Sequence, residues 1–119
     1  MNRAVEKCGT GTSRPAGLDR IVGNLASGVT GSFSDADREA KALLTQWMTA
    51  AGMSVRQDNA GNLFGRLEGR KGGPVIMTGS HLDSVKSGGG LDGALGIMAG
   101  LTVAAGLGRA RGQPDKTIE

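Results

Sequence analysis

The clearest helical pattern in the chain follows Ser34. Apolar residues recur there on one side at helical spacing, namely Ala40, Leu43, Leu44, Trp47, Met48 and Ala51. Ser34 is a favourable N-cap, and Asp35 and Asp37 occupy the first turn, where the helix dipole stabilises carboxylates. Gly52 stands where a left-handed residue commonly ends a helix. The pattern therefore predicts an amphipathic helix from residue 35 to about residue 51.

Strand-like patterns follow this helix. Two short runs, residues 53–57 and 63–67, are separated by the turn-forming sequence DNAGN, which predicts a β-hairpin. The continuous apolar run Val75–Met77 is typical of a strand buried on both faces. The last residues, PDKTIE, predict a loop that turns into another strand at Thr117 and Ile118.

A second helix is expected from Asp92 to about Leu107, after a glycine-rich loop. Its apolar residues lie on nearly every side, which is typical of a helix buried in a larger body. We therefore expect the isolated chain to expose apolar surface. Helix, hairpin, buried strand, glycine loop and helix together predict an α/β fold. We interpret residues 31–119 as the incomplete N-terminal part of a catalytic domain, and residues 1–30, which lack a sustained period, as a loosely ordered lead-in.

Composition excludes several classes of protein. The chain has 22 glycines among 119 residues but only three aromatic residues, which argues against modules that stack nucleic-acid bases. Its basic residues are scattered, and the net charge is only +3. No apolar stretch approaches the roughly 20 residues of a membrane helix, and no secretory signal is visible. We expect a cytoplasmic protein that binds neither nucleic acid nor membranes.

The best candidates for chemistry surround the single histidine. His81 and Asp83 are two residues apart, so in an extended segment their side chains point to the same side. The carboxylate could then hold one imidazole nitrogen and turn the other outward as a metal ligand. The intervening glycines could bring Asp92 near His81. Zinc normally takes three or four ligands, so the remaining ligands of such a site must come from elsewhere.

A second motif occupies the same region. Gly88, Gly90 and Gly93 satisfy the G-x-G-x-x-G pattern of dinucleotide-binding loops. The glycines do not follow the strand directly, and Asp92 would place a negative charge where a pyrophosphate should bind. A non-catalytic nucleotide-binding or interaction module that uses this loop remains the alternative interpretation.

Two stretches of sequence resemble a known family. GSHLDSVKSGGGLDGALGIMAGL, residues 79–101, is similar to the metal-binding signature of the hydantoinase/carbamoylase amidohydrolases. That group contains N-carbamoyl-L-amino-acid hydrolases and allantoate amidohydrolases, and it is related to the dinuclear-zinc aminoacylases and carboxypeptidases. Residues 28–69 also resemble the opening helix and hairpin of the group.

The resemblance implies a dinuclear-zinc-peptidase-like catalytic domain that holds two divalent metal ions, zinc first, with manganese or cobalt as alternatives. His81 looks like a ligand of one ion, Asp92 like the carboxylate that bridges both, and Asp83 like the catalytic-site aspartate that orients His81. A metal-activated water would cleave a C–N bond of a small linear amide or ureido compound.

The same resemblance bears on the whole protein and on the isolated chain. It implies a homodimer, and it places the general base and the remaining ligands beyond Glu119. We therefore expect no hydrolysis and at most weak metal binding from these 119 residues alone.

Overall fold

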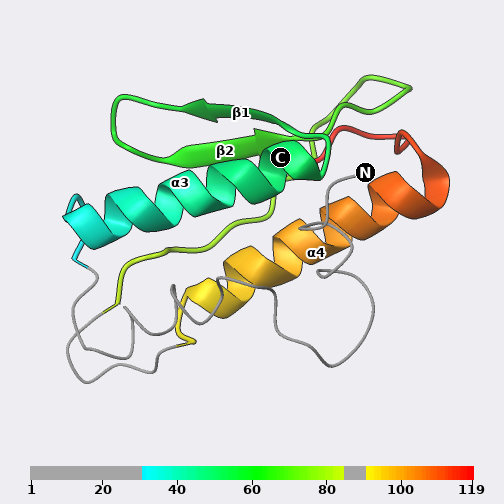
Figure 1. Cartoon of the computed structure of the whole chain (residues 1–119). Helices are drawn as coiled ribbons and strands as arrows, with labels where there is room; N and C mark the ends of the chain where they lie inside the picture. Colours follow the sequence, from blue (N-terminus) through cyan, green and yellow to red (C-terminus); the bar gives the residue numbers. More distant parts are fainter. Residues whose placement is uncertain (1–30, 85–90) are drawn as a thin grey trace.

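A computed structural model describes residues 31–84 and 91–119, and the structural statements below concern these residues (Figure 1). Two helices, α3 (Asp35–Ala50) and α4 (Ala94–Arg111), flank a hairpin of β1 (Ser54–Gln57) and β2 (Leu63–Arg66). Helix, hairpin, extended segment and helix follow one another as predicted, and the α/β fold class is confirmed. The lead-in predicted for residues 1–30 lies outside the described residues.

The first turn of α3 is held by the residues that the sequence pattern singled out. The hydroxyl of Ser34 accepts a hydrogen bond from the backbone N–H of Asp37 at 3.2 Å. The Asp37 carboxylate is itself buried, accepts a hydrogen bond from the backbone N–H of Phe33, and pairs with the ammonium of Lys41 at 2.8 Å. The buried charge therefore has partners, as a desolvated carboxylate requires.

The other end of α3 is closed by a Schellman motif. Gly52 has a φ of +83°, and its N–H donates to the carbonyl of Thr49 at 3.0 Å. The N–H of Met53 donates to the carbonyl of Met48, also at 3.0 Å. The predicted helix end is confirmed, and the motif directs the chain into β1.

The hairpin pairs β1 with β2 in antiparallel register, with Val55 opposite Gly65. Its connection is organised by Asp58, whose carboxylate accepts hydrogen bonds from the backbone N–H groups of Ala60 and Asn62 and from the Asn62 side chain. These bonds, above all the one from the Asn62 side chain, lower the pKa of Asp58. A short acidic side chain thus fixes a five-residue connection, as the turn-rich sequence predicted.

The end of the chain lies between the hairpin and the segment that follows it. Ile118 bridges Leu67 in antiparallel fashion on one side and Ile76 in parallel fashion on the other. The strand start predicted at Thr117 and Ile118 therefore agrees with the structure. Glu119 follows Ile118 in the same extended direction, and its carboxylate pairs with the guanidinium of Arg56 at 3.0 Å.

The buried strand predicted at Val75–Met77 is not observed. The side chains of Val75, Ile76 and Met77 are 38, 53 and 67% exposed, and the segment is extended with a single bridge to Ile118. The prediction assumed neighbours on both faces and along both edges. Within the described part of the chain, only residues 117–119 pair with this segment, along one edge, so the apolar run remains largely open to solvent.

The core lies between the two helices and one side of the sheet. One cluster joins Leu44 of α3 to Leu82 and to Ala94 of α4. A second cluster joins Leu101 of α4 to Met53, with Trp47, Met48, Leu67 and Ile118 packed against it. Both helices therefore cover the side of the sheet toward which Ile118 points.

Helix α4 begins two residues later than predicted. Gly93 has a φ of +78°, which is not helical, so Asp92 precedes the helix instead of opening it. The apolar surface expected on this helix is present, because Leu95 and Val103 are about 60% exposed. None of the described helices is long and apolar enough to cross a membrane.

Candidate functional site

The segment that carries His81 lies directly against the backbone of α4. A Cβ atom built on Gly96 would stand 2.8 Å from the Cβ of Ser80, and one built on Gly100 would stand 3.1 Å from the Cγ2 of Thr78. Both distances are shorter than ordinary contacts between carbon atoms. The two glycines, one turn apart, thus let the extended segment pack closer to the helix than any side chain would allow.

Gly93, just before the start of the helix, is a third glycine that lies against the segment carrying His81. A Cβ atom there would lie 2.3 Å from the carbonyl oxygen of His81 and 2.6 Å from its Nδ1 atom. Its positive φ would also strain any residue with a side chain. Glycine at this position therefore brings Asp92, the residue before it, against the histidine.

The imidazole of His81 is held on one edge by Asp83. Its Nδ1 atom lies 2.9 Å from the backbone carbonyl oxygen of Asp83 and 3.2 Å from the Oδ1 atom of that residue's carboxylate. Both acceptors favour a proton on Nδ1, which leaves the lone pair of Nε2 available. The sequence-based expectation that the two side chains point to one side agrees with this geometry.

Asp92 approaches the other edge of the same ring. Its Oδ2 atom lies 4.0 Å from the Nε2 atom of His81, although the two residues are eleven positions apart. Both side chains are more than half exposed, at 52% for His81 and 67% for Asp92. One imidazole nitrogen and one carboxylate oxygen are donors that zinc commonly takes, and this pair fits such an ion.

The electrostatics of this pair favour a cation. The pKa of His81 is raised, first because the carbonyl of Asp83 accepts its hydrogen bond, and further because the carboxylates of Asp92 and Asp83 are close. The two carboxylates that favour a proton on the ring would also favour a divalent metal ion. A metal ion and a proton would compete for Nε2.

The described residues do not contain a complete metal site. In residues 31–84 and 91–119, no three His, Cys, Asp or Glu side chains stand close enough together to hold an ion. The third and fourth ligands expected from the sequence are not among them. The loop that contains Gly88 and Gly90 lies outside the described residues, so the nucleotide-binding alternative stays a prediction.

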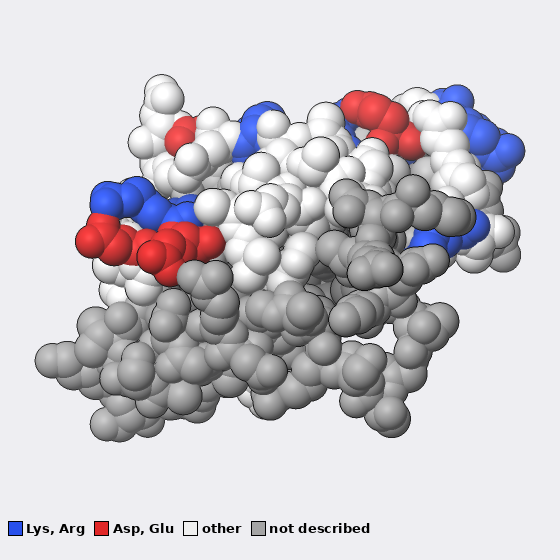
Figure 2. All heavy atoms as spheres, in the orientation of Figure 1, with Lys and Arg blue, Asp and Glu red and all other residues white. Residues whose placement is uncertain are grey.

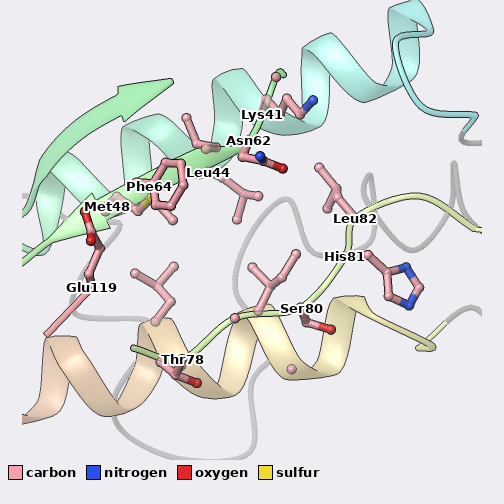
Figure 3. Close-up of a pocket in the computed structure, with 18 of the residues that line it drawn as sticks. Lys41, Leu44, Met48, Asn62, Phe64, Thr78, Ser80, His81, Leu82 and Glu119 are labelled. Carbon is pink, nitrogen blue, oxygen red and sulfur yellow. The ribbon is translucent and has the colours of Figure 1, made fainter. Parts of the chain in front are cut away.

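A cavity of about 530 Å³ adjoins the histidine (Figure 3), and no pattern in the sequence predicted it. Lys41 from α3 and Asn62 from the connection between β1 and β2 lie on one side, and Thr78 and Ser80 from the extended segment lie on the other. No motif connects these positions in the sequence. Only the packing of α3, the hairpin and α4 brings them around one space.

Charged side chains on the visible surface are mixed in sign. Figure 2 shows acidic and basic groups next to each other on this face. Among the described residues, Arg38 pairs with Asp35, and Arg70 and Lys71 pair with Asp115. A large area of one sign is absent from the described part of this face, as the scattered charges of the sequence predicted.

Known proteins resemble this chain over most of its length. Residues 62–119 match Peptidase family M28. The N-carbamoyl-L-amino acid amidohydrolase of Geobacillus stearothermophilus is 49% identical over 88 residues, which are 72% of this chain and 22% of that protein. The allantoate amidohydrolase of Bacillus subtilis is 44% identical over 73 residues, which are 60% of this chain and 18% of that protein.

The fold has solved counterparts as well. A hydantoinase/carbamoylase family amidase from Burkholderia ambifaria superposes with a TM-score of 0.69 at 35% identity, covering 87% of this chain and 28% of that one. The chain thus spans about a quarter of the length of the proteins it matches. The resemblance inferred from the sequence is confirmed, and the chain is a relative of the hydantoinase/carbamoylase amidohydrolases over the part that it shares with them.

Proposed function

We propose that this chain is part of a metal-dependent amidohydrolase that cleaves a C–N bond, other than a peptide bond, in a small linear amide or ureido compound. One observation carries the proposal: His81 and Asp92 converge at 4.0 Å while Asp83 holds the far side of the imidazole. The names of the relatives, which are amidohydrolases of carbamoyl amino acids and of allantoate, support the reaction class.

Each residue of the site has a distinct part in this proposal. His81 would hold a divalent ion through Nε2, Asp92 would hold it through its carboxylate, and Asp83 would keep the Nδ1 proton in place. The ion, when bound, polarises the carbonyl of the substrate and lowers the pKa of a bound water. The resemblance implies two ions, to both of which Asp92 would be a ligand, with zinc as the first choice and manganese or cobalt as alternatives.

The assembly and location of the whole protein are part of the same proposal. We propose a homodimer in the cytoplasm, with a small molecule as its substrate and with neither nucleic acid nor a membrane as its partner. On the described part of the face in Figure 2, acidic and basic side chains lie next to each other, which supports this expectation for that face. The isolated chain should bind metal weakly and should not turn over substrate, because no third protein ligand stands beside His81 and Asp92 among the described residues. The general base that the resemblance implies is also not assigned to any of these residues.

The function is tested on the protein encoded by the whole reading frame that contains this sequence. We expect it to hydrolyse N-carbamoyl amino acids or allantoate when supplied with zinc, manganese or cobalt ions, and to lose activity with a chelator. His81→Ala should lower kcat/KM by at least about 100-fold, because it removes a metal ligand. The matched control is Asp115→Asn, since this carboxylate pairs with Arg70 and Lys71 in a separate loop.

A binding measurement on the 119-residue chain separates the proposal from the nucleotide-binding alternative. Titration with cobalt ions should show binding that His81→Ala weakens at least about tenfold and that Asp115→Asn leaves unchanged. Equal cobalt affinity in the His81→Ala and unaltered chains, together with a whole protein that hydrolyses none of these substrates, would overturn the proposed function. Binding of ATP that survives His81→Ala would favour the alternative.

A further inference from the structure

Leu82 stands between the two site residues that lie on the extended segment. Neighbouring side chains of an extended segment point to opposite sides, so Leu82 points away from the side that His81 and Asp83 share. Figure 3 shows the Leu82 side chain directed toward α3 and the His81 ring directed away from it. The histidine side chain is 52% exposed, whereas Leu82 is only 9% exposed. The segment therefore has an open side that carries the site and a buried side at Leu82.

Leu82 is also the one buried residue in a long stretch of chain. Every residue from 71 to 81 is exposed, and residues 83 and 84 are half-buried. Within the described residues, no backbone-to-backbone hydrogen bond holds residues 79–83 to another segment, and the nearest one before them joins Thr78 to Glu119. The side chain of Leu82 is therefore the main apolar attachment of the segment that carries His81.

The cluster that receives Leu82 also receives the chain just after Asp92. Leu82 and Ala94 both belong to the apolar cluster that Leu44 of α3 joins. Ala94 is 3% exposed and comes two residues after Asp92, whereas Leu82 directly follows His81. Each half of the site is thus attached to the same cluster within two residues of its candidate ligand.

Close packing against α4 does not by itself decide which side of the segment faces Asp92. Gly93 and Gly96 let the backbone approach the helix, and this sets the distance between the segment and α4. A rotation of the segment about its own axis would keep that distance but would turn His81 inward and Leu82 to solvent. Burial of the leucine disfavours this rotation, because a large apolar side chain is more stable inside than an imidazole.

We propose that Leu82 is a positioning residue of the candidate metal site, whose burial keeps His81 turned toward Asp92. The inference rests on the proposed function, because it concerns the ion that this pair would hold. The orientation of the imidazole, however, is a property of the chain without metal. Shortening the side chain of Leu82 should therefore disturb both the ring and the affinity for a cation.

The first readout is the tautomer of His81 in the metal-free chain. The chain has one histidine, so the NMR signals of its imidazole nitrogens are unambiguous. At a pH where the ring is neutral, the unaltered chain should carry the proton mainly on Nδ1, which lies 2.9 Å from the carbonyl oxygen of Asp83. Leu82→Ala should lower the Nδ1–H fraction at least about twofold, because the segment loses the attachment that holds this geometry. Leu82→Met, which keeps a long apolar side chain, should retain the tautomer.

The second readout is the affinity for cobalt ions, with Leu101→Ala as the matched control. Leu101 is 5% exposed and belongs to the other core cluster, with Met53 and Ala104, so its truncation removes the same atoms from a different part of the core. Leu82→Ala should weaken cobalt binding at least about tenfold, as the loss of a residue that supports a metal ligand commonly does. Leu101→Ala should leave the affinity within about twofold of that of the unaltered chain.

Circular dichroism first establishes that each variant is folded. If Leu82→Ala is not, Leu82→Val takes its place, since it removes a single methylene and should change the tautomer in the same direction. An unchanged tautomer in the shortened variant would overturn the proposal, and so would an equal loss of cobalt affinity in Leu101→Ala. If the unaltered chain bound no cobalt, the proposed function would lose its support, while the tautomer would still decide the role of Leu82.

Discussion

The imidazole Nδ1 of His81 lies 2.9 Å from the backbone carbonyl oxygen of Asp83 and 3.2 Å from its carboxylate Oδ1. One residue thus offers two acceptors to one ring nitrogen. The backbone carbonyl fixes the ring whatever side chain stands at position 83. The carboxylate adds negative charge, which makes the opposite nitrogen a better ligand for a cation.

This double contact predicts a graded response to substitution of Asp83. Asp83→Ala should lower the affinity for cobalt ions about 10- to 100-fold, the usual effect of losing such a partner. Asp83→Asn keeps an oxygen near Nδ1 but removes the charge, so it should lose less affinity than Asp83→Ala. The measurement is isothermal titration with cobalt ions at constant pH. Equal affinities for all three chains would show that the carboxylate has no influence on the ligand.

The local elements were predictable because short-range signals specify them. Ser34 and Gly52 lie at the ends of α3 in the structure as the sequence indicated, and each acts through bonds to residues within four positions. The hairpin connection is similar, since Asp58 binds only residues of its own turn. Predictions of this kind need no knowledge of the rest of the fold.

Burial of the Val75–Met77 segment was not predictable in this way. An apolar run indicates a buried strand only if other chain segments cover both faces, and the described residues leave these side chains open. The start of α4 was misplaced for a related reason. Gly93 has a positive φ, and its close approach to the carbonyl of His81 leaves no room for a Cβ atom. That contact is visible only in three dimensions.

The candidate site was predictable in part. The spacing of His81 and Asp83 predicted that their side chains point to the same side. The glycines that follow predicted that the chain can fold back and bring Asp92 near His81. The lining of the cavity by Lys41 and Asn62 could not be foreseen, because it depends on how α3 and the hairpin pack. Roles of these residues in metal binding or hydrolysis stay predictions.

The turn at Asp58 predicts a pH-dependent contribution to stability. Hydrogen bonds from Asn62 and Ala60 lower the pKa of this carboxyl below its usual 3.8, so the folded state favours the ionised form. The resulting stabilisation is complete above the unfolded pKa of about 4 and is lost as the pH falls through the lower pKa of the folded state. Asp58→Asn should therefore have a lower Tm than the unaltered chain at pH 7. The difference should shrink below about pH 4, which thermal melts at several pH values would reveal.

Two leucines offer a matched test of the core. Leu44 of α3 is 3% exposed and contacts the cluster that links the helices, whereas Leu95 of α4 is 62% exposed. Leu44→Ala should lower the free energy of unfolding by about 2–5 kcal/mol, because it leaves a cavity. Leu95→Ala should change it by no more than about 0.5 kcal/mol. Urea denaturation followed by circular dichroism measures both, and equal effects would show that Leu44 is not in a packed core.

Two glycines of α4 separate close packing from helix propensity. A Cβ atom on Gly96 would lie 2.8 Å from the Cβ of Ser80, whereas one on Gly106 would meet nothing within 4 Å. Alanine is favoured over glycine in a helix by about 1 kcal/mol, so Gly106→Ala should raise the free energy of unfolding by up to that amount. Gly96→Ala gains the same propensity but forces the segment before His81 away from the helix, at a cost of about 1–3 kcal/mol.

The two substitutions should therefore have opposite signs in urea denaturation. Gly96→Ala should also weaken cobalt binding, because the displaced segment carries His81 away from Asp92. Gly106→Ala should leave that binding unchanged. If Gly96→Ala stabilised the chain as much as Gly106→Ala does, then the close contact between the extended segment and α4 would not exist in solution.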